Sequence, residues 1–274
     1  MTPAPASALP VLFLSHGSPM FALDPGHTGP VLRRYGQQLQ ARGDLRGVLV
    51  MSPHWMAHEV EVMTQPRPPT WHDFGGFPEP LYRLQYPAPG SPALAATVLE
   101  QLHAAGIPAQ ADPSRPFDHG AWVPLMHMLP QADVPVVQLA LPAGDGPREL
   151  YALGRALASL RQQGILIVAS GSMTHNLREF FGGRPALEAP PAPYVEGFAR
   201  WVEATLQAND RERLFDYRRQ APHAVRAHPT DEHFLPLYFA LGAAGWGEPE
   251  AAGPDYLSRE VMYSHLAMDA IALH

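Results

Sequence analysis

Three short apolar runs of this sequence are each followed by a polar turn that contains a histidine. The runs and their histidines are Val11–Leu14 with His16, Val48–Met51 with His54, and Ile165–Ala169 with His175. If the runs are parallel strands, their carboxyl ends meet at one edge of a sheet, where ligands bind in α/β proteins. Neutral imidazole is a good ligand for Zn, Fe, Cu and Ni. The pattern therefore predicts a metal site, with His16 and His54 as the best pair of ligands.

Two further histidines lie beside acidic residues at expected helix starts. His233 ends the run Thr230-Asp231-Glu232-His233, before the apolar stretch Phe234–Leu241, and it offers another ligand. His119 follows Asp118 in a loop before a short helix, where it could orient a ligand or act as a base. Taken alone, each is explained equally well by helix capping or loop hydrogen bonding. The coincidence with the strand-end histidines favours a functional role.

Strands and helices alternate along the chain. Strands are expected at Val11–Leu14, Val48–Met51, Val134–Leu141 and Ile165–Ala169, with Glu59–Thr64 nearer a sheet edge. Helices are expected at Val31–Ala41, Pro92–Ala105, Arg148–Gln162, Ala192–Ala208 and Glu232–Gly242. This order predicts an α/β fold in which a mainly parallel central sheet is covered by helices. We expect a single catalytic domain over residues 1–274, with its active site at the strand carboxyl ends.

Long connections rich in proline and glycine separate these elements. They are Gln65–Pro92, Pro108–Pro116 and Gly182–Pro193. Connections of this length usually build a binding site, so Trp71–Pro89 is a candidate pocket wall. Trp55, Phe74 and Trp122 lie near the histidine motifs and are the expected wall for a flat aromatic ring; the alternative is packing onto the core.

Composition excludes several classes of protein. All 19 basic residues are Arg, which rules out a phosphate-loop lysine and Schiff-base chemistry. There is no Cys, so any metal must be held by His, Asp or Glu. The net charge is −7 and the basic residues are scattered, which argues against nucleic acid as a partner. A serine triad is disfavoured because the sequence has no Gly-x-Ser-x-Gly motif.

The sequence predicts neither a signal peptide nor a membrane-spanning segment. The first ten residues, MTPAPASALP, lack a basic start followed by an apolar run. No apolar stretch approaches the roughly 20 residues that a spanning helix needs. A cytoplasmic location is therefore expected.

Seven blocks of this sequence, in order, resemble the DOPA 4,5-dioxygenase branch of the class III extradiol ring-cleaving dioxygenases. They are Ser-His-Gly-Ser-Pro (15–19), Ser-Pro-His-Trp (52–55), His-Asp-Phe-Gly-Gly-Phe-Pro (72–78), Tyr-Pro-Ala-Pro-Gly (86–90), Asp-His-Gly-Ala-Trp-Val-Pro-Leu (118–125), His-Asn-Leu (175–177) and Asp-Glu-His-Phe-Leu-Pro-Leu (231–237). The blocks span nearly the whole chain, which makes the resemblance far more specific than any single motif.

The resemblance implies roles for five histidines. His16, His54 and His233 match the metal ligands of the family. His175 matches its acid/base histidine, which some members' site descriptions also count as metal-associated, and His119 matches a block beside the oxygen and substrate pocket. A related branch uses a glutamate as third ligand, so Glu232 remains an alternative to His233.

The resemblance also implies the reaction. It is the cleavage of a DOPA-like catechol by O₂, beside the two hydroxyls, at one divalent metal per chain. Fe(II) is expected for activity, and Zn(II) could be bound to the purified protein. A zinc hydrolase on the same site and a non-enzymatic, Memo-like interaction protein are the alternatives. The catechol and the oligomeric state stay open.

Overall fold

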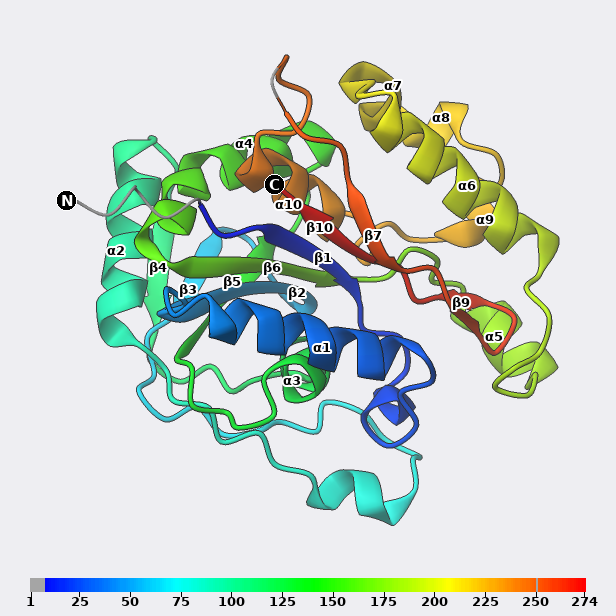
Figure 1. The fold of residues 1–274 in the computed structure, drawn as a ribbon, viewed down its shortest axis with the longest axis horizontal. Helices are drawn as coiled ribbons and strands as arrows, with labels where there is room; N and C mark the ends of the chain where they lie inside the picture. Colours follow the sequence, from blue (N-terminus) through cyan, green and yellow to red (C-terminus); the bar gives the residue numbers. More distant parts are fainter. Residues whose placement is uncertain (1–7, 250) are drawn as a thin grey trace.

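The structure is a computed structural model that describes residues 8–249 and 251–274. Residues 1–7, most of the stretch inspected for a signal peptide, lie outside these ranges. Within them, an eight-stranded sheet has the order β4-β3-β5-β2-β6-β1-β10-β7 (Figure 1). The central strands β5, β2, β6 and β1 are mutually parallel. Antiparallel pairing brings β10 and β7 to one side and joins β3 to β5 on the other. The predicted α/β fold with a mainly parallel sheet is confirmed.

The sheet strands and the principal helices have the following bounds. The strands are β1 (Val11–Ser15), β2 (Gly47–Ala57), β3 (Val60–Met63), β4 (Ala109–Asp112), β5 (Val136–Pro142), β6 (Ile165–Gly171), β7 (Asp255–Ser258) and β10 (Ala270–Leu273). The longer helices are α1 (Thr28–Ala41), α2 (Pro92–Ala104), α3 (His119–Met128), α4 (Pro147–Leu157), α5 (Leu177–Gly183), α6 (Pro193–Gln207) and α10 (Pro236–Ala244). Short elements are α7 (Arg211–Phe215), α8 (Tyr217–Gln220), α9 (Ala224–Ala227), β8 (Val261–Met262), β9 (Leu266–Ala267) and the 3₁₀ turns η1 (Pro19–Ala22), η2 (Glu79–Arg83) and η3 (Ala158–Gln163).

Helices cover both faces of the sheet (Figure 1). α1 and α3 pack on one face, and α2, α4, α6 and α10 contribute to the core on the other. β1 shows why both faces need cover: Val11 and Phe13 enter one core, while Leu12 and Leu14 enter the other. A strand buried on both faces appears in sequence as a continuous apolar run, which is how it was recognised.

Three expectations about the elements need correction. The expected helix Glu232–Gly242 begins only at Pro236, because residues 231–235 form turns closed by bonds from the Phe234 and Leu235 amides to the Asp231 carbonyl. The connection Pro108–Pro116 contains β4, which pairs with β3 at the sheet edge. β2 does not end at Met51 but continues to Ala57 through an irregularity between Ser52 and Met56.

The described helices include none that is both long enough and apolar enough to cross a membrane.

Candidate metal centre and active site

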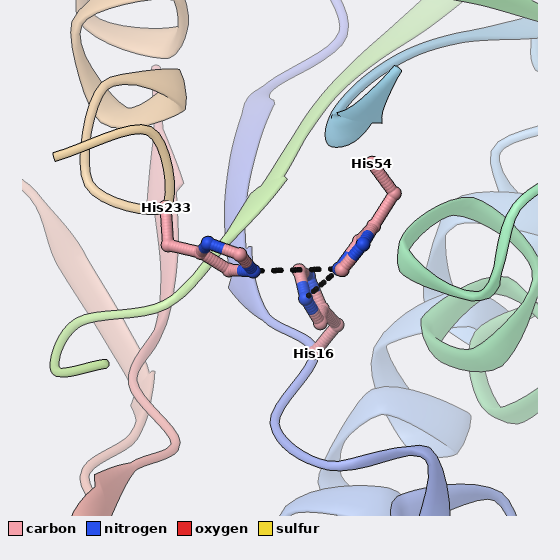
Figure 2. Close-up of side chains that lie close together, drawn as sticks. All are labelled: His16, His54 and His233. Atoms are coloured by element: carbon pink, nitrogen blue, oxygen red, sulfur yellow. Dashed lines mark hydrogen bonds between the residues drawn. The ribbon is translucent and has the colours of Figure 1, made fainter. Parts of the chain in front are cut away.

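Three histidines converge at the carboxyl end of the parallel strands (Figure 2). His16 directly follows β1, and His54 lies in the irregular part of β2, where the pairing with β5 is interrupted. His233 comes from the turns that precede α10. The structure thus brings together side chains that are 38 and 179 residues apart in sequence.

Hydrogen bonds fix the orientation of two of these rings. The Ser170 hydroxyl donates its single hydrogen to the Gly120 carbonyl, so at 2.9 Å it must accept from His16 Nδ1–H. The Glu232 carboxylate, an acceptor, lies 3.0 Å from His233 Nδ1. With Nδ1 protonated in both rings, the Nε2 atoms of His16 and His233 carry free lone pairs. Partners of this kind typically orient metal-binding histidines.

The Nε2 atoms point toward one another, as the dashed lines in Figure 2 show. His54 Nε2 lies 3.1 Å from His16 Nε2 and 3.3 Å from His233 Nε2. Two nitrogens that are each about 2.1 Å from one ion lie about 3.0 Å apart in octahedral geometry and about 3.4 Å apart in tetrahedral geometry. The three rings therefore fit a single divalent cation.

Burial keeps these imidazoles neutral. Desolvation, followed by the repulsion of neighbouring histidines, holds the pKa of His16 and of His233 well below its ordinary value. Burial also lowers the pKa of His54, and His119 adds to the effect, although Asp118 and Asp73 oppose it. Only the neutral ring can bind a cation, so the fold holds the cluster in its metal-binding form without protons to displace.

His119 is held beside this cluster by Asp73. Asp73 Oδ1 accepts from the backbone amide of His119 at 2.9 Å and lies 3.0 Å from His119 Nδ1. Its other oxygen is 3.6 Å from His54 Nδ1. The ring centroids of His54 and His119 are 4.0 Å apart. The Asp73 carboxylate therefore orients His119 and lies close to the ring of His54.

A buried polar network lies beside the segment that carries His54 and the start of α3. Asp118 caps α3 by accepting from the Ala121 amide, and it also accepts from Ser52 and Arg115, each at 2.8 Å. Arg115 donates in addition to the His54 carbonyl at 3.0 Å. Gly120 sits in the middle, where an added Cβ would lie 2.3 Å from the Ser52 hydroxyl. The network ties the His54 bulge to the start of α3.

The His175 ring packs against the ring of His233. The two rings stack with centroids 3.6 Å apart and planes at 8°. The backbone of its turn is anchored, because the His175 amide donates to the Ala227 carbonyl. No hydrogen bond joins its imidazole to another described residue. Burial first, opposed by Glu232 and reinforced by His119, lowers the pKa of His175 to about 4.

A pocket opens over the histidines. Its lining residues, apart from the five histidines, are mostly apolar or aromatic: Gly17, Ser18, Pro19, Phe74, Phe77, Leu177, Phe180, Phe181 and Leu266. Of the three expected wall residues, Phe74 lies here. The structure places the other two in the core: the Trp122 indole donates to the Trp71 carbonyl, and Trp55 is covered by the Arg115 guanidinium.

Several residues of this site were not predicted from the sequence. Asp73 appeared there only inside a motif, and Ser170 was given no role. Phe180 and Phe181 of α5 lie between the block 175–177 and the expected loop Gly182–Pro193, and the sequence analysis gave them no role. Asp73 is 46 residues from His119 in sequence, so no local pattern could connect the two residues.

The chain is similar to known proteins over most of its length. The chain is 39% identical over 234 residues to "4,5-DOPA dioxygenase extradiol" of Beta vulgaris, covering 85% of this chain and 86% of that protein. It is 38% identical over 250 residues to the protein of the same name from Escherichia coli K12, with 89% and 88% covered. A crystal structure of an uncharacterized protein from Escherichia coli K12 superposes with a TM-score of 0.75 at 29% identity, covering 97% of this chain and 100% of that one.

The α/β sheet presents clustered imidazoles that could hold a metal beneath a pocket lined largely by aromatic and apolar side chains. Residues 10–268 match the family described as the catalytic LigB subunit of aromatic ring-opening dioxygenase. This chain belongs to that family. It is a ring-opening dioxygenase, and the family implies a divalent metal, which the histidine cluster suits.

Proposed function

We propose that this enzyme cleaves a catechol beside its two hydroxyls, with O₂ and Fe(II), and that His16, His54 and His233 hold the metal. The observation that carries the ligand assignment is the convergence of three Nε2 atoms at separations of 3.1 and 3.3 Å. The names of the relatives support the extradiol reaction on a catechol. The position of Glu232 favours His233 as the ligand, because the Glu232 carboxylate already accepts a hydrogen bond from His233 Nδ1.

Iron is preferred to zinc on chemical grounds. When bound, Fe(II) supplies the Lewis acidity that ionises a catechol hydroxyl and the redox activity that a reaction with O₂ requires. Zinc has no redox chemistry, although the same imidazoles bind it well. Zinc in a purified sample would therefore not argue for hydrolysis.

His175 is the proposed proton carrier. Its ring is neutral at pH 7, so a ring nitrogen can accept a proton from a catechol hydroxyl, while burial, which lowers its pKa to about 4, favours return of that proton. Its imidazole lines the pocket and has no hydrogen-bond partner in the described chain that would compete for that proton. The protonated ring can return the proton as the aromatic ring opens.

His119 is the proposed positioning group on the other side, with a ring nitrogen that can accept a hydrogen bond or a proton. The Asp73 carboxylate accepts from Nδ1–H, which leaves Nε2 available to the pocket. A carboxylate in this place also stabilises the imidazolium that forms when the ring takes up a proton. We expect His119 to interact with the oxygen or the ring substituents as they rearrange.

The function is tested by anaerobic reconstitution of the apoprotein with Fe(II) or with Zn(II), followed by addition of air and a panel of catechols. Oxygen uptake and a yellow ring-opened product are expected with Fe(II) only. If the Fe(II) protein consumed no oxygen with any catechol, the dioxygenase assignment would fail.

A further inference from the structure

A second hollow lies beside the helices α1 and α3, away from the catalytic pocket. Arg33, Arg34 and Gln37 line it from α1, and His127 lines it from α3. None of its lining residues lines the catalytic pocket. Its volume of about 420 Å³ lies within the roughly 300–1,000 Å³ of small-molecule sites. The proposed dioxygenase reaction gives this hollow no role.

Glycines of α1 shape the contact between the two helices. At Gly36 the helix backbones are in close contact, because an added Cβ would collide with the Met128 carbonyl oxygen. Nearer the start of α1, Gly29 lines the hollow, and a Cβ added there would lie 3.8 Å from His127 Nδ1. The Nδ1 edge of the His127 ring therefore faces the part of the hollow that Gly29 borders.

His127 offers the hollow a hydrogen-bond acceptor. Its Nε2 lies 2.8 Å from the Phe21 carbonyl oxygen, which can only accept, so Nε2 carries the proton. Burial, opposed by this bond and reinforced by the charge of Arg33, lowers the pKa of His127, so the ring is neutral and Nδ1 keeps its lone pair. The residue is only 7% exposed, and no hydrogen bond joins Nδ1 to another described residue.

Two positive charges border the same hollow without a counter-ion. Arg33 and Arg34 are exposed, and neither forms an ion pair or a hydrogen bond with another described residue. Among the described residues, no Asp or Glu lines the hollow. The Glu260 carboxylate at the start of α1 is already engaged by the amide and the hydroxyl of Thr28, at 2.8 and 2.7 Å. Guanidinium groups that lack an acidic partner are suited to bind an oxyanion.

We propose that this hollow is a second ligand site, which binds a phosphate group that retains a proton. The guanidinium groups of Arg33 and Arg34 bind the anionic oxygens, and the P–O–H group donates to His127 Nδ1. An oxyanion without a hydrogen, such as sulfate, satisfies the arginines but turns an oxygen lone pair toward that of Nδ1. Two cationic donors beside one buried acceptor therefore select for phosphate over sulfate.

The test is calorimetric titration of the full-length protein at pH 6, with metal removed so that oxyanions cannot coordinate it. At this pH inorganic phosphate carries hydrogens and mostly a single charge, whereas sulfate carries two charges and no hydrogen. Phosphate should nevertheless bind about tenfold more tightly, because sulfate leaves the buried Nδ1 without a donor. Equal or tighter binding of sulfate, or no binding of phosphate, would overturn the proposal. Oxygen uptake with catechols is a separate measurement, so this outcome leaves the dioxygenase function intact.

The same titration with glycerol phosphate distinguishes two sources of the phosphate group. About half of a phosphate monoester is protonated at pH 6. Tighter binding of inorganic phosphate would identify the free ion as the ligand, and tighter binding of the ester would identify a phosphorylated small molecule that uses the remaining volume.

Variants locate the site. Arg33→Gln and Arg34→Gln should each weaken phosphate binding by about tenfold to 100-fold, since each loses a charge-assisted hydrogen bond. Arg67→Gln, at an exposed arginine that does not line the hollow, is the matched control and should bind as wild type. Phosphate affinity that is unchanged in both α1 variants would refute the site.

The acceptor has its own variant. His127→Phe keeps an aromatic ring against Phe21 but removes Nδ1, and should abolish the preference for phosphate over sulfate. A preference that persists in this variant would contradict the role of His127. If the variant does not fold, the comparison of phosphate with sulfate on the wild-type protein still decides the proposal.

Discussion

His16 and His175 both follow central parallel strands, yet they are held in different ways. The imidazole of His16 is completely buried, and its Nδ1 is fixed by Ser170. The imidazole of His175 is only partly buried and stacks on His233, while its surrounding backbone is firmly anchored. A ring with a fixed hydrogen bond presents one lone pair in one direction, which suits a metal ligand. A ring without such a bond can take and release a proton, which suits an acid/base group.

The largest effect is expected at the fixed ring. His16→Ala removes one of three converging imidazole nitrogens, and should cost more metal affinity than the roughly 10–100-fold typical for loss of an outer hydrogen-bond partner. Activity should fall with the metal content. Metal analysis after equilibration with a weak chelator measures this, alongside circular dichroism to verify folding. A fully loaded His16→Ala protein would show that the ligand assignment is wrong.

For His175, whose ring is less constrained, a substitution should lower turnover without a matching loss of metal. His175→Gln should retain most of the metal but lose about 10²–10⁴-fold in kcat, the usual contribution of acid–base catalysis. His58→Gln, at an exposed position in the turn between β2 and β3, is the matched control and should behave as wild type. Metal content and rate are measured on the same preparation. If metal and rate were lost in proportion, His175 would be a ligand as well.

The sequence predicted the parts of this site that local patterns encode. Strand-like runs followed by His16 and His175 were visible because a doubly buried strand is continuously apolar. Asp73 and Ser170 were not assigned, because their roles depend on contacts with residues 46 and 154 positions away. The start of α10 was misplaced, since Asp231 resembles a helix cap but closes turns instead.

The anchoring of the His175 turn gives a third prediction. His228 Nε2 donates to the carbonyl of Met173 in this turn, and burial, opposed by that bond, lowers the pKa of His228 to about 3. The ring is therefore neutral in the folded protein but protonated in the unfolded chain below pH about 6.5. Its contribution to stability is present above that pH and is lost as the pH falls toward 3.

Between pH 7 and pH 4, this histidine should account for about 3 kcal/mol of the decrease in unfolding free energy. His228→Gln keeps a donor for the Met173 carbonyl and does not titrate, so its stability should decrease less over this range. Urea titrations of both apoproteins, with chelator present, measure the difference. If the unfolding free energies of the two proteins fell by the same amount between pH 7 and pH 4, burial would not be what keeps His228 neutral.

A smaller loss of metal affinity is expected for Glu232→Gln, next to the proposed ligand His233, than for loss of a ligand. His233 Nε2 faces His54 Nε2 at 3.3 Å, whereas the Glu232 carboxylate lies 3.0 Å behind the ring, at Nδ1. If His233 is the ligand, Glu232→Gln only weakens an orienting bond and should lower metal affinity by about 10–100-fold, while His233→Ala removes the lone pair and should lower it further. Competition with a chromogenic chelator ranks the two variants directly. The reverse ranking, with His233→Ala still loaded and Glu232→Gln empty, would make the glutamate the third ligand. It would also require the Glu232 side chain to leave His233 Nδ1 and turn toward the other two imidazoles.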